Sequence, residues 1–165
     1  MPGEAAPHRA HTVIDSPLGP LTLVAADGEL VALHMDRWRH RPIDEEYGEP
    51  DPRPFQTAIT QLGEYFDGRR TRFDLPLRLN GTPFQKQVWR TLMEIPYGET
   101  MTYGELAAKI GRPTAARAVG HANARNPISI IVPCHRLVGS TGDLTGYGGG
   151  LDRKRQLLAL ERRNT

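Results

Sequence analysis

The first part of the chain alternates short apolar runs with turn residues, as antiparallel strands do. Apolar and β-branched residues fill positions 12–14, 21–26 and 30–35, and such runs favour strands. A Ser-Pro-Leu-Gly turn at 16–19 separates the first two runs, and Asp27-Gly28, a strong hairpin signal, separates the second and third. We therefore expect three strands in a small antiparallel sheet.

The apolar spacing then changes from that of a strand to that of a helix. Residues 42–54 contain four prolines and five acidic residues, which predicts a connecting loop. Apolar side chains then recur at helical spacing at Phe55, Ile59, Leu62 and Phe66. Residues 73–79 alternate again and predict one more strand, whereas the first ten residues are expected to be disordered. The N-terminal half is thus predicted to be an α+β scaffold without a site of its own.

The second half begins with two helix-start motifs. Thr82-Pro83-Phe84-Gln85 and Thr102-Tyr103-Gly104-Glu105 both match the Thr-x-x-Gln/Glu capping box. The first motif predicts a helix that ends before Pro96, and the second predicts a helix that ends at Gly111. A proline precedes another predicted helix, from Thr114 to about Ala124. The last two helices match a helix-turn-helix, a pattern that is often purely structural.

The only cysteine of the chain, Cys134, follows an apolar run. Residues 128–132 are mostly β-branched, which predicts a short buried strand, and Pro133 would end it because proline has no N–H for a sheet. A free thiol has a pKa of about 8.5 and needs help to react at neutral pH. His135 and Arg136 are the nearest groups that could give it. A lone cysteine is, however, more often a small buried hydrophobic residue than a nucleophile.

The composition is that of a folded domain with a substantial core: 165 residues, 38% hydrophobic and 24% charged. No run approaches the ~20 apolar residues of a membrane helix, and the N-terminus lacks the basic and apolar regions of a signal peptide. We therefore expect a cytoplasmic protein without a membrane partner. One cysteine and six scattered histidines offer neither an internal disulfide nor a cluster of metal ligands, so no metal or cofactor is expected.

The net charge of +2 conceals an asymmetry between the two halves. Residues 1–81 contain 9 Lys/Arg and 13 Asp/Glu, a net charge of 9 − 13 = −4. Residues 82–165 contain 12 Lys/Arg and 6 Asp/Glu, a net charge of 12 − 6 = +6. The half with the cysteine is thus the basic half, which favours a polyanionic partner.

The C-terminal half resembles the O6-alkylguanine-DNA alkyltransferase family, from about Phe84 to Glu161. The resemblance is highly specific there and loose in the N-terminal half. Its motifs are Ala115-Ala116-Arg117-Ala118-Val119-Gly120, Asn126-Pro127, Val132-Pro133-Cys134-His135-Arg136 and Tyr147-Gly148-Gly149-Gly150. We expect an α+β protein in which an N-terminal domain, 1–81, consists of a small antiparallel sheet and a helix. This domain packs on a mainly helical C-terminal domain, 82–165, which contains the helix-turn-helix and the strand that ends at Cys134.

The resemblance implies direct-reversal DNA repair. An alkyl group, typically methyl, would move irreversibly from O6-alkylguanine, and also from O4-alkylthymine, in duplex DNA to Cys134. Each molecule would act once, after the nucleotide has been flipped out of the helix, because a stacked base cannot reach a buried sulfur. In the family's scheme Glu161 orients His135, which takes the Cys134 proton through a water.

Glu161 also stands out by its position in the last predicted helix. It lies near the middle of an apolar arc formed by Leu151, Leu157, Leu158 and Leu160. A carboxylate that faces a core is costly unless it has a partner. The alternative to a role beside His135 is that Glu161 only pairs with an arginine of its own helix.

The resemblance also implies the residues that contact DNA and the base. The DNA-binding positions are Tyr103, Thr114, Ala116, Arg117 and Arg125. Arg117 stands among small side chains, and it would replace the flipped nucleotide in the stack while Tyr103 presses on the adjoining phosphate. The substrate pocket would contain Asn126, Arg136, Leu137, Tyr147, Gly148 and Lys154. Lys154, Tyr103 and Tyr147 would assist the departure of guanine, and some family members have Ser in place of Gly148, which leaves the range of alkyl groups open.

Two other functions remain open at this point. A cysteine hydrolase could use Cys134 and His135, although no oxyanion-hole motif is present. A non-catalytic lesion sensor or regulator could bind DNA through the helix pair, but alkyltransferase-like proteins of that kind replace the cysteine, which this chain retains. The expected partner is double-stranded DNA with O6-alkylguanine, bound by a monomer that can cluster along the duplex.

Overall fold

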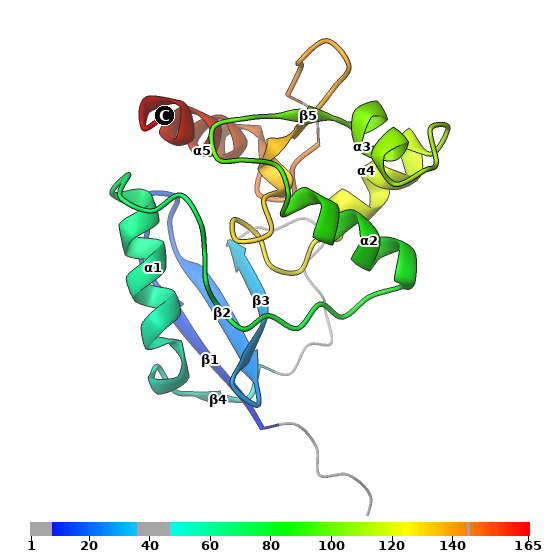
Figure 1. Cartoon of the computed structure of the whole chain (residues 1–165). Coiled ribbons are helices and arrows are strands. Elements are labelled where there is room, and N and C mark those ends of the chain that lie inside the picture. The colour runs from blue at the N-terminus through cyan, green and yellow to red at the C-terminus, as the bar shows by residue number, and fades with distance from the viewer. Residues whose placement is uncertain (1–7, 36–46, 145) are drawn as a thin grey trace, which may run out of the picture.

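The computed structural model describes residues 8–35, 47–144 and 146–165. Figure 1 shows a sheet with helix α1 against it, and helices α2 to α5 grouped together beyond the sheet. One cluster of buried apolar side chains runs through both parts, from Leu23 in the sheet to Trp89 and Leu157 in the helices. The α+β architecture predicted from the sequence is confirmed, and the division at residue 81 stays a prediction.

The sheet has the spatial order β3-β2-β1-β4. Its strands are β1 (Arg9–Ile14), β2 (Leu21–Ala26), β3 (Glu29–Met35) and β4 (Glu49–Pro50). The first three are antiparallel neighbours, as expected, and β4 adds a short parallel pairing with β1. Asp27 and Gly28 turn the β2–β3 hairpin with φ values of 51° and 83°, the left-handed conformation that these residues tolerate best.

Three N-terminal expectations need correction or fall outside the described residues. The predicted strand at 73–79 is wrong: only an isolated bridge joins Leu77 to Leu30, and Pro76, which has no N–H, interrupts further pairing. Of the ten residues expected to be disordered, 1–7 lie outside the described part, but Arg9 and Ala10 belong to β1. The predicted loop at 42–54 is described only from Tyr47, and it includes β4.

Helix α1 (Gln56–Phe66) follows the short 3-10 helix η1 (Arg53–Phe55) at the predicted place. Its apolar side faces the sheet, and its side chains Leu62 and Tyr65 are fully buried. Tyr65 is the larger of the two and has a hydroxyl, and a buried tyrosine hydroxyl usually has a hydrogen-bond partner. That partner lies in the C-terminal part.

The C-terminal part is mainly helical, as predicted. Its elements are α2 (Pro83–Leu92), β5 (Met101–Thr102), α3 (Tyr103–Lys109), α4 (Ala116–Ala124), η2 (Cys134–Arg136), β6 (Leu137–Val138) and α5 (Leu151–Arg163). Both capping boxes are present, with Thr82 and Thr102 as the caps. Helix α4 begins two residues later than predicted, at Ala116, because the Ala115 N–H closes a turn on Arg112 after the intervening proline.

The predicted buried strand at 128–132 is wrong. These residues form consecutive turns, in which the Val132 N–H bonds to the Ile128 carbonyl and Ile130 has a positive φ of 71°. The Asn126 side chain closes the loop by donating to the Val132 carbonyl (2.8 Å) and accepting from the Ile128 N–H (3.0 Å). The loop is buried, and the periodicity of a short apolar run does not by itself determine its backbone conformation.

No helix in the described part of the chain is long and apolar enough to cross a membrane.

Candidate functional site

Cys134 is the first residue of η2, directly after the loop that Asn126 closes. Only 1% of its surface is exposed. Burial raises the pKa of the thiol to about 11, although the Asn126 side chain and the positive charge of Lys154 act to lower it. A thiol with such a pKa is about 0.01% thiolate at pH 7. Cys134 therefore needs a nearby group that takes its proton as it reacts.

The next residue, His135, has the free nitrogen that this task requires. Its Nε2 lies 2.7 Å from Glu161 Oε2, and because a carboxylate only accepts, Nε2 holds the hydrogen. Nδ1 then has a lone pair, and it has no hydrogen-bond partner among the described residues. Burial lowers the pKa of His135, and the Glu161 carboxylate opposes this shift. The imidazole is thus a neutral base with Nδ1 as its accepting atom.

Glu161, on α5, is surrounded by donors and fully buried. It accepts five hydrogen bonds from described residues: from Tyr65, His135 and Arg136 Nη2 at Oε2, and from Arg136 Nε and the Gly98 N–H at Oε1. Burial alone would raise the pKa of Glu161, but the His135 hydrogen bond and the Arg136 ion pair outweigh it and hold the pKa far below its usual range. Glu161 is therefore a permanent anion that orients His135. We call Cys134, His135 and Glu161 the relay.

Three of the predicted pocket residues, Asn126, Tyr147 and Lys154, lie close enough to Cys134 to interact with it. Lys154, fully buried on α5, donates from Nζ to the Leu137 carbonyl at 2.6 Å, and burial lowers its pKa to about 8. The Tyr147 hydroxyl lies 3.1 Å from Ser129 Oγ, and burial raises the Tyr147 pKa well above its ordinary value, so the hydroxyl keeps its hydrogen. Asn126, Leu137, Tyr147, Gly148 and Lys154 are all buried.

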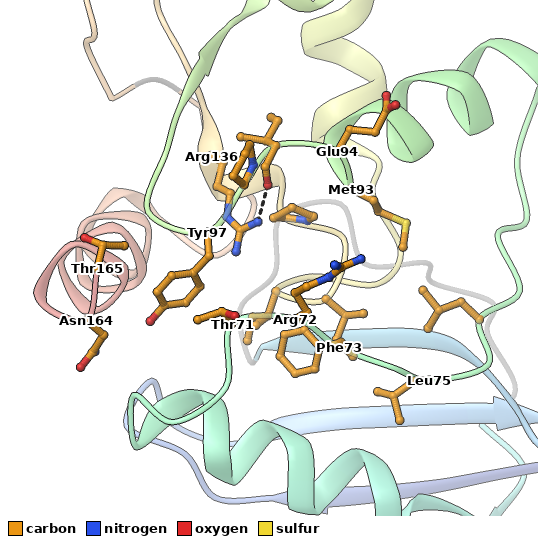
Figure 2. Close-up of a pocket in the computed structure, with 16 residues that line it drawn as sticks. Thr71, Arg72, Phe73, Leu75, Met93, Glu94, Tyr97, Arg136, Asn164 and Thr165 are labelled. Carbon is orange, nitrogen blue, oxygen red and sulfur yellow. Dashed lines mark hydrogen bonds between the residues drawn. The ribbon is translucent and has the colours of Figure 1, made fainter.

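Arg136 was expected in the substrate pocket, but its guanidinium is bound elsewhere. It donates to both oxygens of Glu161, and its Nη1 donates to the Ile95 carbonyl at 2.7 Å. Figure 2 shows this bond at the wall of a cavity of about 840 Å³, which Phe73 and Tyr97 also line. The positive charge of Arg136 thus stabilises Glu161.

The predicted DNA-binding residues lie on the helix pair α3–α4 or directly beside α4. Thr114, Arg117 and Arg125 are exposed, Ala116 is half-buried at the start of α4, and Tyr103 begins α3. Gly120 lies beside the Tyr103 ring, where an added Cβ would stand 3.6 Å from the ring edge. On the inner side of α4, the Trp89 indole donates to the Ala122 carbonyl (2.8 Å) and the Asn123 amide donates to the Cys134 carbonyl (3.4 Å). The exposed helix face and the thiol thus belong to one connected unit.

Two family models together match most of the chain. The family model "6-O-methylguanine DNA methyltransferase, DNA binding domain" matches residues 83–163, and the corresponding "ribonuclease-like domain" matches residues 10–79. A methylated-DNA--protein-cysteine methyltransferase of Mycolicibacterium paratuberculosis is 55% identical over 94% of this chain and 93% of its own length. The chain belongs to the methylated-DNA–protein-cysteine methyltransferase family.

Other methyltransferases of this family lead to the same assignment. The Methanosarcina barkeri protein is 50% identical over 93% of this chain and 98% of its own length. The fold matches that of Mycobacterium tuberculosis OGT in complex with DNA, with a TM-score of 0.88 and 52% identity over 94% of each chain. It also matches the Pyrococcus kodakaraensis O6-methylguanine-DNA methyltransferase, with a TM-score of 0.62 and 26% identity over 93% of this chain and 98% of the other.

The structure of this methyltransferase family member reveals contacts that the sequence did not suggest. Tyr65, from the N-terminal half, bonds to Glu161 across 96 residues of sequence, and Gly98 and Asn123 add backbone and amide contacts to the relay. Tyr65 lies on the apolar side of a predicted helix, where an aromatic residue is expected for packing alone. The available signal was its hydroxyl, since a buried Tyr usually has a hydrogen-bond partner.

Proposed function

We propose that this chain repairs DNA by taking the methyl group of O6-methylguanine in duplex DNA onto Cys134, once per molecule. The observation that supports this function most directly is the relay. A buried thiol is followed by an imidazole whose Nε2 is bound to an ionised carboxylate and whose Nδ1 is left as an acceptor. A nucleophile, a base and a group that orients the base are the parts that nucleophilic displacement by a thiol requires.

In the proposed reaction, His135 Nδ1 accepts the Cys134 proton through one bridging water. Sγ attacks the methyl carbon, so that an S–C bond forms and the C–O6 bond breaks with its electron pair left on guanine. A proton then reaches guanine, which leaves as the neutral base, and the thiol proton and the methyl group have exchanged places. Lys154, Tyr103 and Tyr147 assist this departure. General-base assistance of this kind is typically worth ~10²–10⁴ in rate.

The product explains why each molecule acts once. A thioether is not a disulfide, so thiol exchange cannot remove the methyl group. The protein is thus a stoichiometric reagent, unlike a cysteine hydrolase, which would release its product.

On the DNA side, α3 and α4 dock in the minor groove and flip the damaged nucleotide. Arg117 enters the stack, Tyr103 presses on the adjoining phosphate, and Thr114, Ala116 and Arg125 contact the backbone. The exposure of Thr114, Arg117 and Arg125 supports this role, and flipping is required because the buried thiol cannot reach a stacked base. Arg117→Ala should slow transfer from duplex DNA more than reaction with free O6-benzylguanine, and equal losses would contradict the role.

The finer expectations are part of this proposal. O4-alkylthymine is a second substrate, and the protein acts in the cytoplasm as a monomer that can cluster along DNA. The basic C-terminal half, with a net charge of 12 − 6 = +6 over residues 82–165, supports binding to a polyanion.

The test is the intact mass of the protein after mixing with duplex DNA that contains O6-methylguanine. The account predicts one added methyl group on Cys134, which saturates at one equivalent. Cys134→Ala should bind the same DNA and gain no mass. A hydrolase would leave the mass unchanged, and so would a sensor, so an unmodified wild-type protein after saturation with DNA would contradict the proposal.

A further inference from the structure

The relay receives one hydrogen bond from the N-terminal part of the molecule. Tyr65, in α1, donates from its hydroxyl to Glu161 Oε2 at 2.6 Å, and both side chains are fully buried. A short bond from a hydroxyl to a carboxylate is of the strong, charge-assisted kind. Burial, followed by the nearby Glu161 charge, raises the Tyr65 pKa far above its usual value, so the hydroxyl keeps its hydrogen. Tyr65 is thus a fixed donor at all pH values of interest.

The oxygen that Tyr65 contacts is the one that holds His135. Glu161 Oε2 accepts from Tyr65 at 2.6 Å and from His135 Nε2 at 2.7 Å. Rotation of the carboxylate would move both bonds together, and the bonds from Arg136 and Gly98 to Oε1 oppose that rotation from the other side. The direction in which His135 Nδ1 points therefore depends on a hydroxyl from α1.

We propose that Tyr65 is a positioning residue for methyl transfer, whose hydroxyl holds Glu161 Oε2 where it orients His135. This inference rests on the proposed function, and it gives the N-terminal part a role in the reaction beyond that of a scaffold. Tyr65 touches neither the substrate nor sulfur, and it acts only through Glu161.

The hydroxyl also affects how strongly His135 holds a proton. Its hydrogen stabilises the negative charge on Oε2, which weakens the attraction between Glu161 and an imidazolium. Without the hydroxyl, that attraction grows, so the pKa of His135 rises. Protonated His135 cannot accept the thiol proton, so a higher pKa moves the acid limb of the rate profile to higher pH. Among the described residues, the other titratable and charged groups that face His135 and Glu161 are Cys134, Arg136, Lys154, Tyr97 and Tyr147. Removal of the Tyr65 hydroxyl leaves all of these groups in place.

The neighbouring Tyr97 provides a matched control. Its ring packs edge-on against the Tyr65 ring, with centroids 6.1 Å apart. The Tyr97 hydroxyl is also buried, but the side chain that acts on it is Asn164, and the hydroxyl makes no hydrogen bond to Glu161. Tyr65→Phe and Tyr97→Phe therefore remove the same atom from the same aromatic cluster, and only the first removes a bond to Glu161. The ring at position 65, whose centroid lies 5.4 Å from that of Phe73, is kept in both variants.

The experiment is single-turnover methyl transfer from O6-methylguanine DNA as a function of pH, for the wild type and both variants. We expect Tyr65→Phe to be about tenfold slower at pH 7, the effect of losing one hydrogen bond to a charged group. Its acid limb should lie about half a unit to one unit higher in pH than that of the wild type. Tyr97→Phe should match the wild type in both respects, and DNA affinity should be equal in all three.

A folded Tyr65→Phe protein whose rate and pH profile superimpose on those of the wild type would overturn the inference. If this variant does not fold, 3-fluorotyrosine at position 65 replaces it, because it keeps the ring and makes the hydroxyl a stronger donor. The acid limb should then move to lower pH, and an unmoved limb would overturn the inference. A wild-type protein that transfers no methyl group at any pH would instead refute the proposed function.

Discussion

The two sides of His135 are built in opposite ways. On one side, Glu161 accepts five hydrogen bonds from described residues, and its pKa is held far below the usual range. On the other side, burial raises the pKa of Cys134 to about 11, and His135 Nδ1 has no hydrogen-bond partner among the described residues. The Nε2 side of His135 is thus saturated with donors, and the Nδ1 side is left open.

This difference shows how a buried thiol can stay inert until substrate arrives. An anion with enough donors does not change its protonation state, so Glu161 can orient the base without taking part in proton transfer. A thiol that is poorly stabilised as a thiolate does not react with other electrophiles in the meantime. In the proposed reaction, the carboxylate therefore provides the fixed geometry, and the proton moves from Cys134 through the bridging water to His135.

The largest effect should follow from a change on the saturated side, Glu161→Gln. The amide presents hydrogens to donors that need acceptors, so His135 loses its orientation and transfer should slow by ~10²–10⁴. The same change leaves Arg136 buried without its partner, which typically costs ~3–5 kcal/mol of stability. Single-turnover kinetics and a melting curve measure the two effects.

Asp152→Asn is the matched control for that variant. It neutralises a carboxylate on the same helix, paired with Arg155, that is 93% exposed. Rate and melting temperature should both remain close to those of the wild type. A Glu161→Gln protein within twofold of the wild-type rate would mean that the carboxylate serves structure alone.

A smaller effect should follow on the open side from Lys154→Met. The positive charge of Lys154 lowers the Cys134 pKa, and few other groups do so. At pH 7 Lys154 is charged, because its pKa is about 8, and loss of the charge should slow the reaction with free O6-benzylguanine about tenfold. The rate is measured at pH 7 for the variant and the wild type, with the exposed Arg155→Met as control. A Lys154→Met protein that reacts as fast as the wild type at pH 7 would show that Lys154 does not act on sulfur.

The smallest effect should appear in the pH dependence of stability. The folded-state pKa of Glu161 lies below its unfolded value, so its contribution is fully present above the unfolded pKa of about 4.3 and is lost as pH falls toward the folded pKa. The free energy of unfolding of the wild type should thus fall below about pH 4.3. Glu161→Gln, measured by urea unfolding, should lose part of that slope, and an equal slope in both proteins would contradict the depressed pKa.

The helices and the hairpin were predictable because local signals determine them. The capping boxes at Thr82 and Thr102 and the Asp27-Gly28 turn are present as expected. The loop before Cys134 was not predictable, because a short apolar run shows only that its residues are buried, and the turns depend on hydrogen bonds from the Asn126 side chain.

Some contacts of the relay could be predicted from the sequence, and one could not. His135 beside Cys134 is visible in the sequence, and the apolar arc around Glu161 suggested a buried partner, which the structure confirms as His135 together with Arg136. The pairing of Tyr65 with Glu161 could not be predicted, since it depends on how the N-terminal part packs on the helices.

The most direct test of the account is the protonation state of His135 in the unreacted protein. Nitrogen-15 NMR of the histidine rings at pH 7, assigned with a His135→Gln variant, distinguishes the two neutral tautomers from the imidazolium. The account predicts a neutral ring with hydrogen on Nε2 and a bare Nδ1, because Nε2 donates to the ionised Glu161. Hydrogen on Nδ1, or an imidazolium that has already taken the Cys134 proton, would contradict it.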